Sequence, residues 1–222
     1  MADEEKTYLN RKPELLKDLN REVKYWKPIL ARDYGDDLAE AIINDSQLIF
    51  VAMIPALPYI GGEDYLVESF FGSVRCLALY HAMKKNNLTA AMTGRILYMA
   101  ILSQASEPQP SLPPSELLTP DQLTERRKHR ARLSQERLYP GGYVFDYIQG
   151  DGVEFDYGYN FTECAAQKFY HIYGADEFLP YFCQLDFAYA TLYQPGFSRT
   201  LTLAKGDPLC NHRFKSIKNP IP

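Results

Sequence analysis

A thiol, an imidazole and a guanidinium lie within four residues of one another near the end of the sequence, at Cys210, His212 and Arg213. If residues 210–214 form a strand, Cys210 and His212 share one face and Arg213 lies on the other. Two residues along a strand span about 6 to 7 Å, so the thiol and the imidazole can reach one small molecule or one metal ion. The pattern indicates nucleophilic or metal-assisted chemistry. Burial of the cysteine in the core is the alternative.

Two more cysteines, each close to an acidic residue, extend this candidate site. Hydrolysis needs either a thiolate nucleophile or a water molecule that a base or a metal activates. Cys164 opens a predicted helix whose dipole favours the thiolate, and Glu163 before it is a candidate general base. Cys183 lies among apolar residues and is expected in the core. The candidate catalytic residues are therefore Cys210, His212, Glu163, Cys164 and Asp186.

Asp186 falls three residues after Cys183 on nearly the same helix face, within an otherwise apolar segment. A carboxylate in that setting needs a partner, which Arg199 or Arg213 can supply. Arginine also binds a substrate carboxylate through two hydrogen bonds. Both arginines are thus candidates for substrate binding, with ordinary surface or sheet-edge roles as the alternative.

The abundance of aromatic residues, 17 tyrosines and 12 phenylalanines, is compatible with an apolar ligand pocket, although aromatic cores are commoner. Phe145 and Tyr147 are the aromatic candidates for substrate contact. A zinc ion would take Cys164, Cys210 and His212, but the sequence has no Cys-x-x-Cys pair. We therefore expect no cofactor, with zinc as the alternative.

The composition excludes several classes of protein. The chain of 222 residues has 24 basic and 28 acidic residues, which is not the charge balance of a nucleic-acid-binding protein. Its four cysteines are too widely spaced for a disulfide framework. The N-terminus is acidic, unlike a signal peptide, and the apolar run at 48–57 is about half of a membrane span. We expect a cytoplasmic protein with a small-molecule substrate and neither nucleic acid nor membrane as partner. The oligomeric state is open, with a homodimer as one option.

The elements that must position these residues are helices in the first half of the chain. Apolar periodicity predicts helices over residues 14–27, from 36 past 44, over 64–86 and over 88–103. A break is expected at Pro28, and a shaped loop at 54–62. Five prolines within 106–120 mark a connector, and a charged surface helix is expected over 121–137.

The second half mixes strands and helices. The predicted elements are a strand over 143–149, helices over 162–173 and 175–193, and a hairpin of strands over 197–204 and 210–217. The sequence thus predicts an α+β fold, in which a helical N-terminal half packs on a C-terminal β-α-α-β-β antiparallel sheet layer. The expected regions are 1–105 (helical), 106–140 (connector and charged helix) and 141–222 (α+β), within one compact unit.

An ordered set of short segments covers most of residues 45–215. The segments are LPYIGG at 57–62, LALY at 77–80, FDYGYNFTEC at 155–164, YFCQLDF at 181–187, RTLTLAKGD at 199–207, and then Cys210 with Arg213-Phe214. This set resembles the L-2-amino-thiazoline-4-carboxylic acid hydrolase family. The resemblance implies a small hydrolase that opens a cyclic amidine ring, giving N-carbamoyl-cysteine from the thiazoline.

The sequence departs from the family pattern after the last cysteine, where Asn211 and His212 replace an expected acidic and aromatic pair. This difference removes an acid and adds an imidazole, which can change the substrate or the chemistry. The C-terminal segment is more weakly similar to ligand-binding domains related to 4-vinyl reductases. The sequence therefore predicts a hydrolase of a small heterocycle, or a lyase, isomerase or cyclase of the same family. A non-catalytic small-molecule-binding protein is the alternative.

Overall fold

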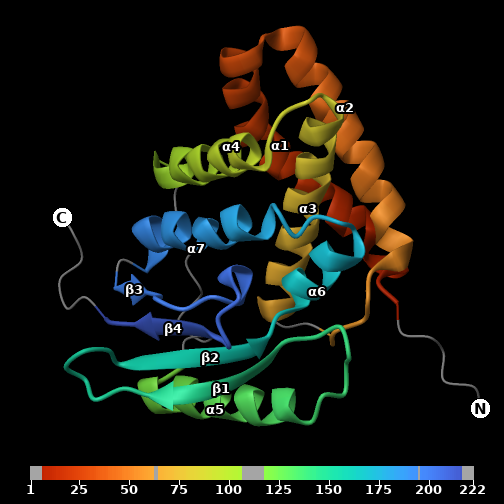
Figure 1. The fold of residues 1–222 in the computed structure, drawn as a ribbon. Coiled ribbons are helices and arrows are strands. Elements are labelled where there is room, and N and C mark those ends of the chain that lie inside the picture. Colours follow the sequence, from red (N-terminus) through yellow and green to blue (C-terminus); the bar gives the residue numbers. More distant parts are fainter. Residues whose placement is uncertain (1–6, 63–64, 107–117, 195, 217–222) are drawn as a thin grey trace, which may run out of the picture.

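The computed structural model describes residues 7–62, 65–106, 118–194 and 196–216. They form an α+β fold in which a stack of helices lies on one side of an antiparallel sheet (Figure 1). The predicted fold class is therefore confirmed. The predicted proline-rich connector falls largely on 107–117, which lie outside the described residues.

Helices account for most of the described chain. They are α1 (Lys12–Tyr34), α2 (Asp36–Met53), α3 (Tyr65–Lys85), α4 (Ala90–Leu102), α5 (Pro120–Gln135), α6 (Ala165–Ile172) and α7 (Leu179–Tyr193). Short 3-10 turns are η1 (Leu9–Arg11), η2 (Ile54–Ala56), η3 (Ser103–Ser106) and η5 (Leu203–Lys205). The helices predicted from residues 36, 64 and 88 are confirmed, and so is the charged surface helix, which is α5.

Helix α1 continues through the proline at which the sequence predicts a break. Pro28 lies inside α1, and the helix ends at Gly35, whose φ of 87° favours glycine. A proline inside a helix costs about 3 kcal/mol. Burial of Leu19, Trp26 and Leu30, each 3% exposed or less, contributes about 1.5–3 kcal/mol per side chain and offsets that loss.

Helix α3 runs through the middle of the helical stack and packs against α2, α4 and α6 (Figure 1). Phe70, Phe71 and Val74 are among its fully buried residues. Apolar residues on all sides are typical of a central helix. Arg75 is buried in the same helix, with only 7% of its surface exposed. A charge in that position needs partners within the protein.

The sheet contains four strands in the order β1-β2-β4-β3, and every neighbouring pair is antiparallel. The strands are β1 (Val144–Gln149), β2 (Tyr157–Glu163), β3 (Phe197–Ser198) and β4 (Cys210–Phe214). The sequence predicts no strand between that over 143–149 and a helix from residue 162, which is wrong, because β2 lies there. Tyr157, Tyr159 and Phe161 alternate along β2, but Gly158 and Asn160 between them have low strand propensity and obscure the pattern.

The predicted strand that begins at Phe197 is wrong beyond its first two residues. Phe197 pairs with Phe214 at the end of β4. Asn211 of β4 holds the residues after β3 mainly through its side chain: its Oδ1 accepts from the N–H groups of Thr200 and Leu201 at 2.9 and 2.6 Å, and its backbone N–H donates to the C=O of Leu201 at 3.3 Å. Strands β3 and β4 pair antiparallel, as in the predicted hairpin, but over two residue pairs, and a segment anchored by the Asn211 side chain joins them.

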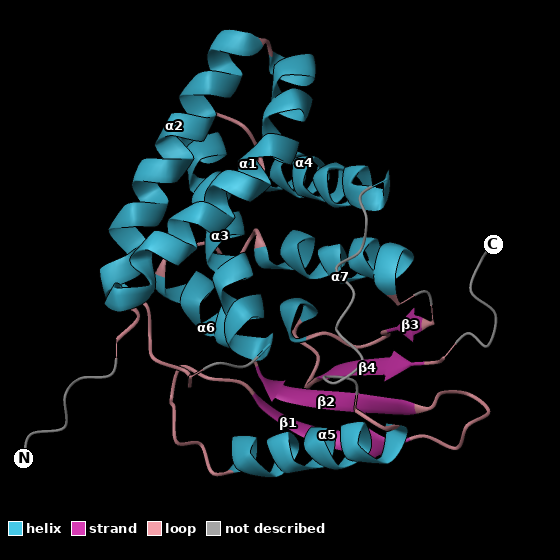
Figure 2. Cartoon of the chain, turned by 180° about the vertical axis from the view of Figure 1, so that it is seen from behind, coloured by secondary structure: helices cyan, strands magenta, loops and turns pink. Residues whose placement is uncertain are grey.

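One face of the sheet is aromatic. Phe145, Tyr159, Phe161 and Phe214 contact one another on it, ring against ring. Helix α7 lies beside β3, and α5 runs along β1 (Figure 2). Ser134 of α5 bonds to both the N–H and the C=O of Phe145 at 3.0 Å, which fixes that helix to the sheet. The sheet thus places its C-terminal strands next to α7.

One described segment, Asp36–Ala56, is long and apolar enough to cross a membrane by length and composition alone. Its Ala39, Ile42 and Phe50 have no exposed surface and belong to the hydrophobic core, whereas Glu40 lies on its exposed side. Core helices of folded domains have the same length and composition. One buried face and one exposed polar face are typical of an amphipathic core helix.

Candidate functional site

The strand predicted from residue 210 is present as β4, and Cys210 shares a face with His212. Cys210 is 7% exposed. Its Sγ accepts a hydrogen bond from the N–H of Leu203 at 3.2 Å, and its thiol donates to Thr202 Oγ1 at 3.5 Å. Cys210 therefore anchors the 3-10 turn η5 to the sheet.

The imidazole of His212 lies among aromatic rings, with its centroid 5.1 Å from that of Phe161 and 5.3 Å from that of Phe197. Burial, together with the positive charges of Arg199 and Arg213, lowers the pKa of His212 to about 3. The imidazole is therefore neutral at pH 7 and a weak general base.

The other candidates on the sheet make internal contacts. Arg213 Nη2 donates to Asn160 Oδ1 at 2.9 Å and so ties β4 to β2. Phe145 is 2% exposed and packs against Phe161, with 4.9 Å between ring centroids. Tyr147 lies on the same aromatic face, and its hydroxyl donates to a neighbouring side chain of β1. These three side chains stabilise the sheet.

Glu163 lies beyond the end of β4, because Cys210, the first residue of that strand, pairs with Phe161. The carboxylate of Glu163 accepts hydrogen bonds from Lys168 and Arg137. These two cations lower the pKa of Glu163, which makes it a weaker base. Glu163 therefore holds α6 to the segment that follows α5.

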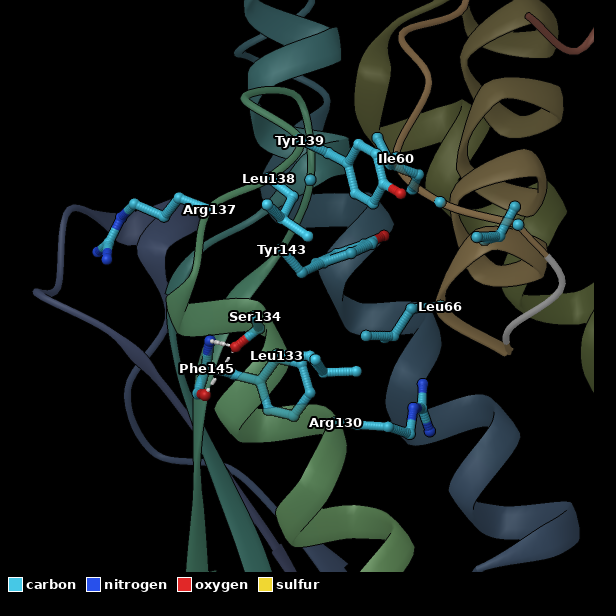
Figure 3. Close-up of a pocket in the computed structure, with 14 residues that line it drawn as sticks. Ile60, Leu66, Arg130, Leu133, Ser134, Arg137, Leu138, Tyr139, Tyr143 and Phe145 are labelled. Carbon is cyan, nitrogen blue, oxygen red and sulfur yellow. Dashed lines mark hydrogen bonds between the residues drawn. The ribbon is translucent and has the colours of Figure 1, made fainter. Parts of the chain in front are cut away.

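A cavity of about 280 Å³ lies between α5, β1 and the loop before α3 (Figure 3). Its apolar lining includes Ile60, Leu66, Leu133, Tyr143 and Phe145. Ser134 at its edge bonds the backbone of β1, and Arg137 pairs with Glu163. The cavity has an apolar lining, as ligand sites do, but Ser134 and Arg137 already bond to other residues of the protein.

A second hollow, which we call the central cleft, consists of two adjoining cavities between α1, α3, α4 and α7. Both cavities are lined by Glu22, Arg75, Cys76, Leu185 and Tyr189. The Asp186 compartment, of about 320 Å³, adds Glu68, Ser69, Gly72, Ser73, Phe182 and Asp186. The Trp26 compartment, of about 560 Å³, adds Arg21, Tyr25, Trp26, Leu97, Ala100, Ile101, Gln104 and Tyr193.

Arg75 is the buried charge at the junction of the two compartments. Its Nε donates to Glu22 Oε1 at 2.7 Å. Its Nη1 is buried and has no hydrogen-bond partner among the described residues. Burial raises the pKa of Glu22, against the opposing charge of Arg75. An unsatisfied buried N–H is costly, so Arg75, which lines both compartments, keeps an unused donor close to the cleft.

Asp186 lies on α7, in another wall of the Asp186 compartment. Arg199 pairs with its Oδ2 and also donates from Nη2 to the C=O of Cys183 at 2.6 Å. The side chain of Arg199 is 4% exposed, whereas that of Asp186 is 44% exposed. Burial raises the pKa of Asp186, although Arg199 opposes the shift. A partly open carboxylate with a raised pKa is suited to general-base chemistry.

The cysteines around α6 and α7 are not activated thiols. Cys164 precedes α6 as its N-cap residue, but burial raises its pKa to about 11. The predicted stabilisation of a Cys164 thiolate is therefore wrong, because desolvation outweighs the helix dipole. Burial raises the pKa of Cys76 and Cys183 as well.

The described part of the chain contains no group of three or more His, Cys, Asp or Glu side chains that could hold a metal ion. The alternative zinc set of Cys164, Cys210 and His212 is therefore not assembled in that part. Two of its members also have other roles, since Cys210 bonds η5 and His212 packs among aromatic rings.

The sequence model of the L-2-amino-thiazoline-4-carboxylic acid hydrolase family matches residues 73–214. The chain belongs to this family. No curated protein and no solved structure matches the chain. The matched region includes Arg75, Asp186 and Arg199. Glu22 and Trp26 precede it.

Sequence reasoning found Asp186 and named Arg199 and Arg213 as its alternative partners, of which the structure shows Arg199, but it missed Arg75 and Glu22. A signal for Arg75 was present, because it is the only Lys, Arg, Asp or Glu between Glu68 and Lys84 in a strongly apolar helix. A charge in such a helix requires a buried partner. The identity of that partner, 53 residues away, is set by the packing of α1 on the helical stack.

Proposed function

We propose that this protein hydrolyses a small carboxylated heterocycle, a cyclic amidine of the thiazoline-carboxylate type, in the Asp186 compartment. The observation that carries the proposal is the guanidinium of Arg75, which lines the same compartment as the partly open carboxylate of Asp186 and whose buried Nη1 has no partner among the described residues. Such a pair suits a substrate with a carboxylate at one end and a cationic amidine at the other. Membership of the family supports the same class of substrate.

Arg75 binds the substrate carboxylate in this scheme. Glu22 holds its Nε, which fixes the plane of the guanidinium and hence the direction of Nη1. A bound carboxylate would satisfy the buried N–H that is otherwise without a partner. A neutral isostere leaves that group unsatisfied, so Arg75 selects carboxylated substrates.

Asp186 acts as the general base. It takes one proton from a water molecule as the water oxygen bonds to the amidine carbon C2 of the ring. The bond between C2 and the ring sulfur then breaks with its electron pair on sulfur, which takes the proton from Asp186. The remaining hydroxyl proton on C2 is released to solvent as the C=O of the urea forms. The product is a ureido thiol, which for the family's namesake substrate is N-carbamoyl-cysteine. Arg199 orients the carboxylate of Asp186 by binding its Oδ2.

Activated water is preferred to a thiolate nucleophile because of the surroundings of the cysteines. Burial raises the pKa of Cys76, which is the cysteine that lines the cleft. A thiol in such surroundings carries very little thiolate at neutral pH. The scheme therefore requires neither a covalent intermediate nor a cofactor.

The test is incubation of the purified protein with 2-aminothiazoline-4-carboxylate and quantification of the released thiol. Asp186→Asn is expected to lower kcat/KM by about 10²–10⁴-fold, the typical contribution of a general base. Glu163→Gln serves as the matched carboxylate control and Cys210→Ser as the thiol control. Both are expected to stay within a few-fold of the unmodified protein.

Two outcomes would contradict the proposal. Loss of turnover in Cys210→Ser with retention in Asp186→Asn would place the reaction on β4. Tight binding of the thiazoline with no thiol release at any pH would favour a non-catalytic small-molecule-binding protein.

A further inference from the structure

The Trp26 compartment is larger than a single small heterocycle requires. Its volume is about 560 Å³, against about 320 Å³ for the Asp186 compartment. Pockets of roughly 300–1,000 Å³ hold drug-sized ligands, so the Asp186 compartment alone can hold one five-membered ring with a carboxylate. The Trp26 compartment adjoins it at Arg75 and Glu22. A ring with its carboxylate in the Asp186 compartment leaves this second space for another part of the ligand.

The walls of the Trp26 compartment combine aromatic and aliphatic side chains with the polar side chains of Arg21, Glu22, Arg75 and Gln104. Trp26, Leu97 and Ile101 are each 5% exposed or less, so their positions are fixed by the core. Tyr189 and Tyr193 of α7 stack on each other, with 6.3 Å between ring centroids and 27° between planes. The aromatic and aliphatic part of this wall is suited to a ring or a branched alkyl group, whereas Arg21 and Gln104 make the rest of the wall polar.

The shape of a thiazoline-4-carboxylate connects the two compartments. The carboxylate is on C4, a substituent on C5 lies next to it, and C2 is on the opposite side of the ring. A molecule that places its carboxylate on Arg75 and its C2 toward Asp186 therefore directs a C5 substituent past Arg75. The Trp26 compartment begins at that point.

We propose that the natural substrate carries an aromatic or branched aliphatic substituent beside its carboxylate, and that the Trp26 compartment binds this substituent. The inference rests on the proposed function, because it uses the carboxylate position at Arg75. Trp26 and the rest of α1 precede the family match at residues 73–214, so this compartment is built partly by a segment outside the matched region.

The test compares 2-aminothiazoline-4-carboxylate with its 5-benzyl derivative. Burial of a benzyl group in the compartment is expected to raise kcat/KM for the derivative by roughly 10–100-fold over the unsubstituted compound. Ala100→Leu fills the compartment and is expected to lower the ratio of the two kcat/KM values at least about tenfold. Ala41→Leu, on the exposed side of α2, is the matched control and should leave the ratio unchanged.

A second variant keeps the test decisive if Ala100→Leu does not fold. Tyr193→Ala removes a 41%-exposed wall residue and is expected to lower the same ratio several-fold. Hydrolysis of both compounds with equal efficiency, unaffected by either variant, would overturn this inference and leave the proposed function standing.

Calorimetry separates failure of the inference from failure of the proposed function. If neither compound is hydrolysed, the proposed function fails, and binding of both compounds to Asp186→Asn still tests the compartment. Tighter binding of the benzyl derivative, lost in the Asp186→Asn/Ala100→Leu double variant, would support the compartment. Equal or absent binding of both compounds would overturn it.

Discussion

Strand β4 and the central cleft both carry a thiol and an arginine, yet they differ in how far their polar atoms are satisfied. On β4, the thiol of Cys210 bonds to η5, and Arg213 bonds to β2. In the cleft, Arg75 keeps one buried N–H without a partner among the described residues, and Asp186 stays partly open to a cavity. Residue types alone made β4 the stronger candidate, whereas unsatisfied groups beside a cavity favour the cleft.

The difference has a structural cause. Residues 199–205 depend on β4 for their conformation, because Asn211 and Cys210 accept hydrogen bonds from their backbone. Arg199, at the start of this segment, reaches back to Asp186 on α7. Strand β4 thus supports the segment whose Arg199 binds Asp186 in the wall of the cleft.

Replacement of Arg75 gives the largest expected effect. Arg75→Ala leaves Glu22 buried without its partner and should destabilise the protein by about 3–5 kcal/mol in denaturant unfolding. Arg213→Ala is the matched control on β4 and should cost about 1 kcal/mol, because it leaves no buried carboxylate behind. The double variant Arg75→Met/Glu22→Gln should recover much of the free energy of unfolding that Arg75→Ala loses. Similar losses for Arg75→Ala and Arg213→Ala would break the distinction between the two regions.

Replacement of Asn211 tests the support role of β4. Asn211→Ala leaves the N–H groups of Thr200 and Leu201 without their acceptor, and unfolding should show a loss of about 1–3 kcal/mol. Asn211→Asp retains an oxygen acceptor at the same place, so its loss should be smaller. An acidic residue is what the family resemblance leads us to expect at this position. Equal losses in the two variants would show that the acceptor oxygen is unimportant.

Local patterns were sufficient to predict much of the fold. The helices from residues 36, 64 and 88 follow from apolar spacing and from the Thr89 cap, which accepts a hydrogen bond from Met92 N–H at 3.2 Å. Strand β2 was missed because Gly158 and Asn160 obscure its pattern and because β4, one of its two neighbouring strands, is distant in sequence. The strand predicted from Phe197 ends early because the N–H groups of Thr200 and Leu201 donate to the side chain of Asn211.

The site was harder to predict than the fold, because its key pairing joins residues that are distant in sequence. Asp186 and Arg199 are 13 residues apart, and an isolated carboxylate in an apolar helix already indicated that it needed a partner. Arg75 and Glu22 are 53 residues apart, and their pairing depends on how α1 packs against α3. An unpaired N–H beside a cavity is a property of three-dimensional packing and has no local sequence signal.

Replacement of Arg199 should change the pH dependence of turnover. Asp186 must be deprotonated to act as a base, so kcat/KM should fall as the pH drops through its raised pKa. Arg199 opposes that rise, and Arg199→Met should therefore move the acidic limb of the profile to higher pH. Arg213→Met is the matched control, since Arg213 bonds Asn160 on β2. A lower rate with an unmoved limb would assign Arg199 a purely structural role.

Glu163→Gln should have the smallest effect, because Glu163 lies outside both regions. Lys168 and Arg137 lower its pKa in the folded protein, so the carboxylate stabilises the fold above its unfolded pKa. That contribution is lost as the pH falls through the lower, folded pKa. For a pair whose carboxylate side chain is 32% exposed, the loss in Glu163→Gln at pH 7 should be at most about 1 kcal/mol in urea unfolding. The difference from the unmodified protein should vanish at acidic pH. A large loss of turnover in this variant would show that Glu163 belongs to the catalytic site.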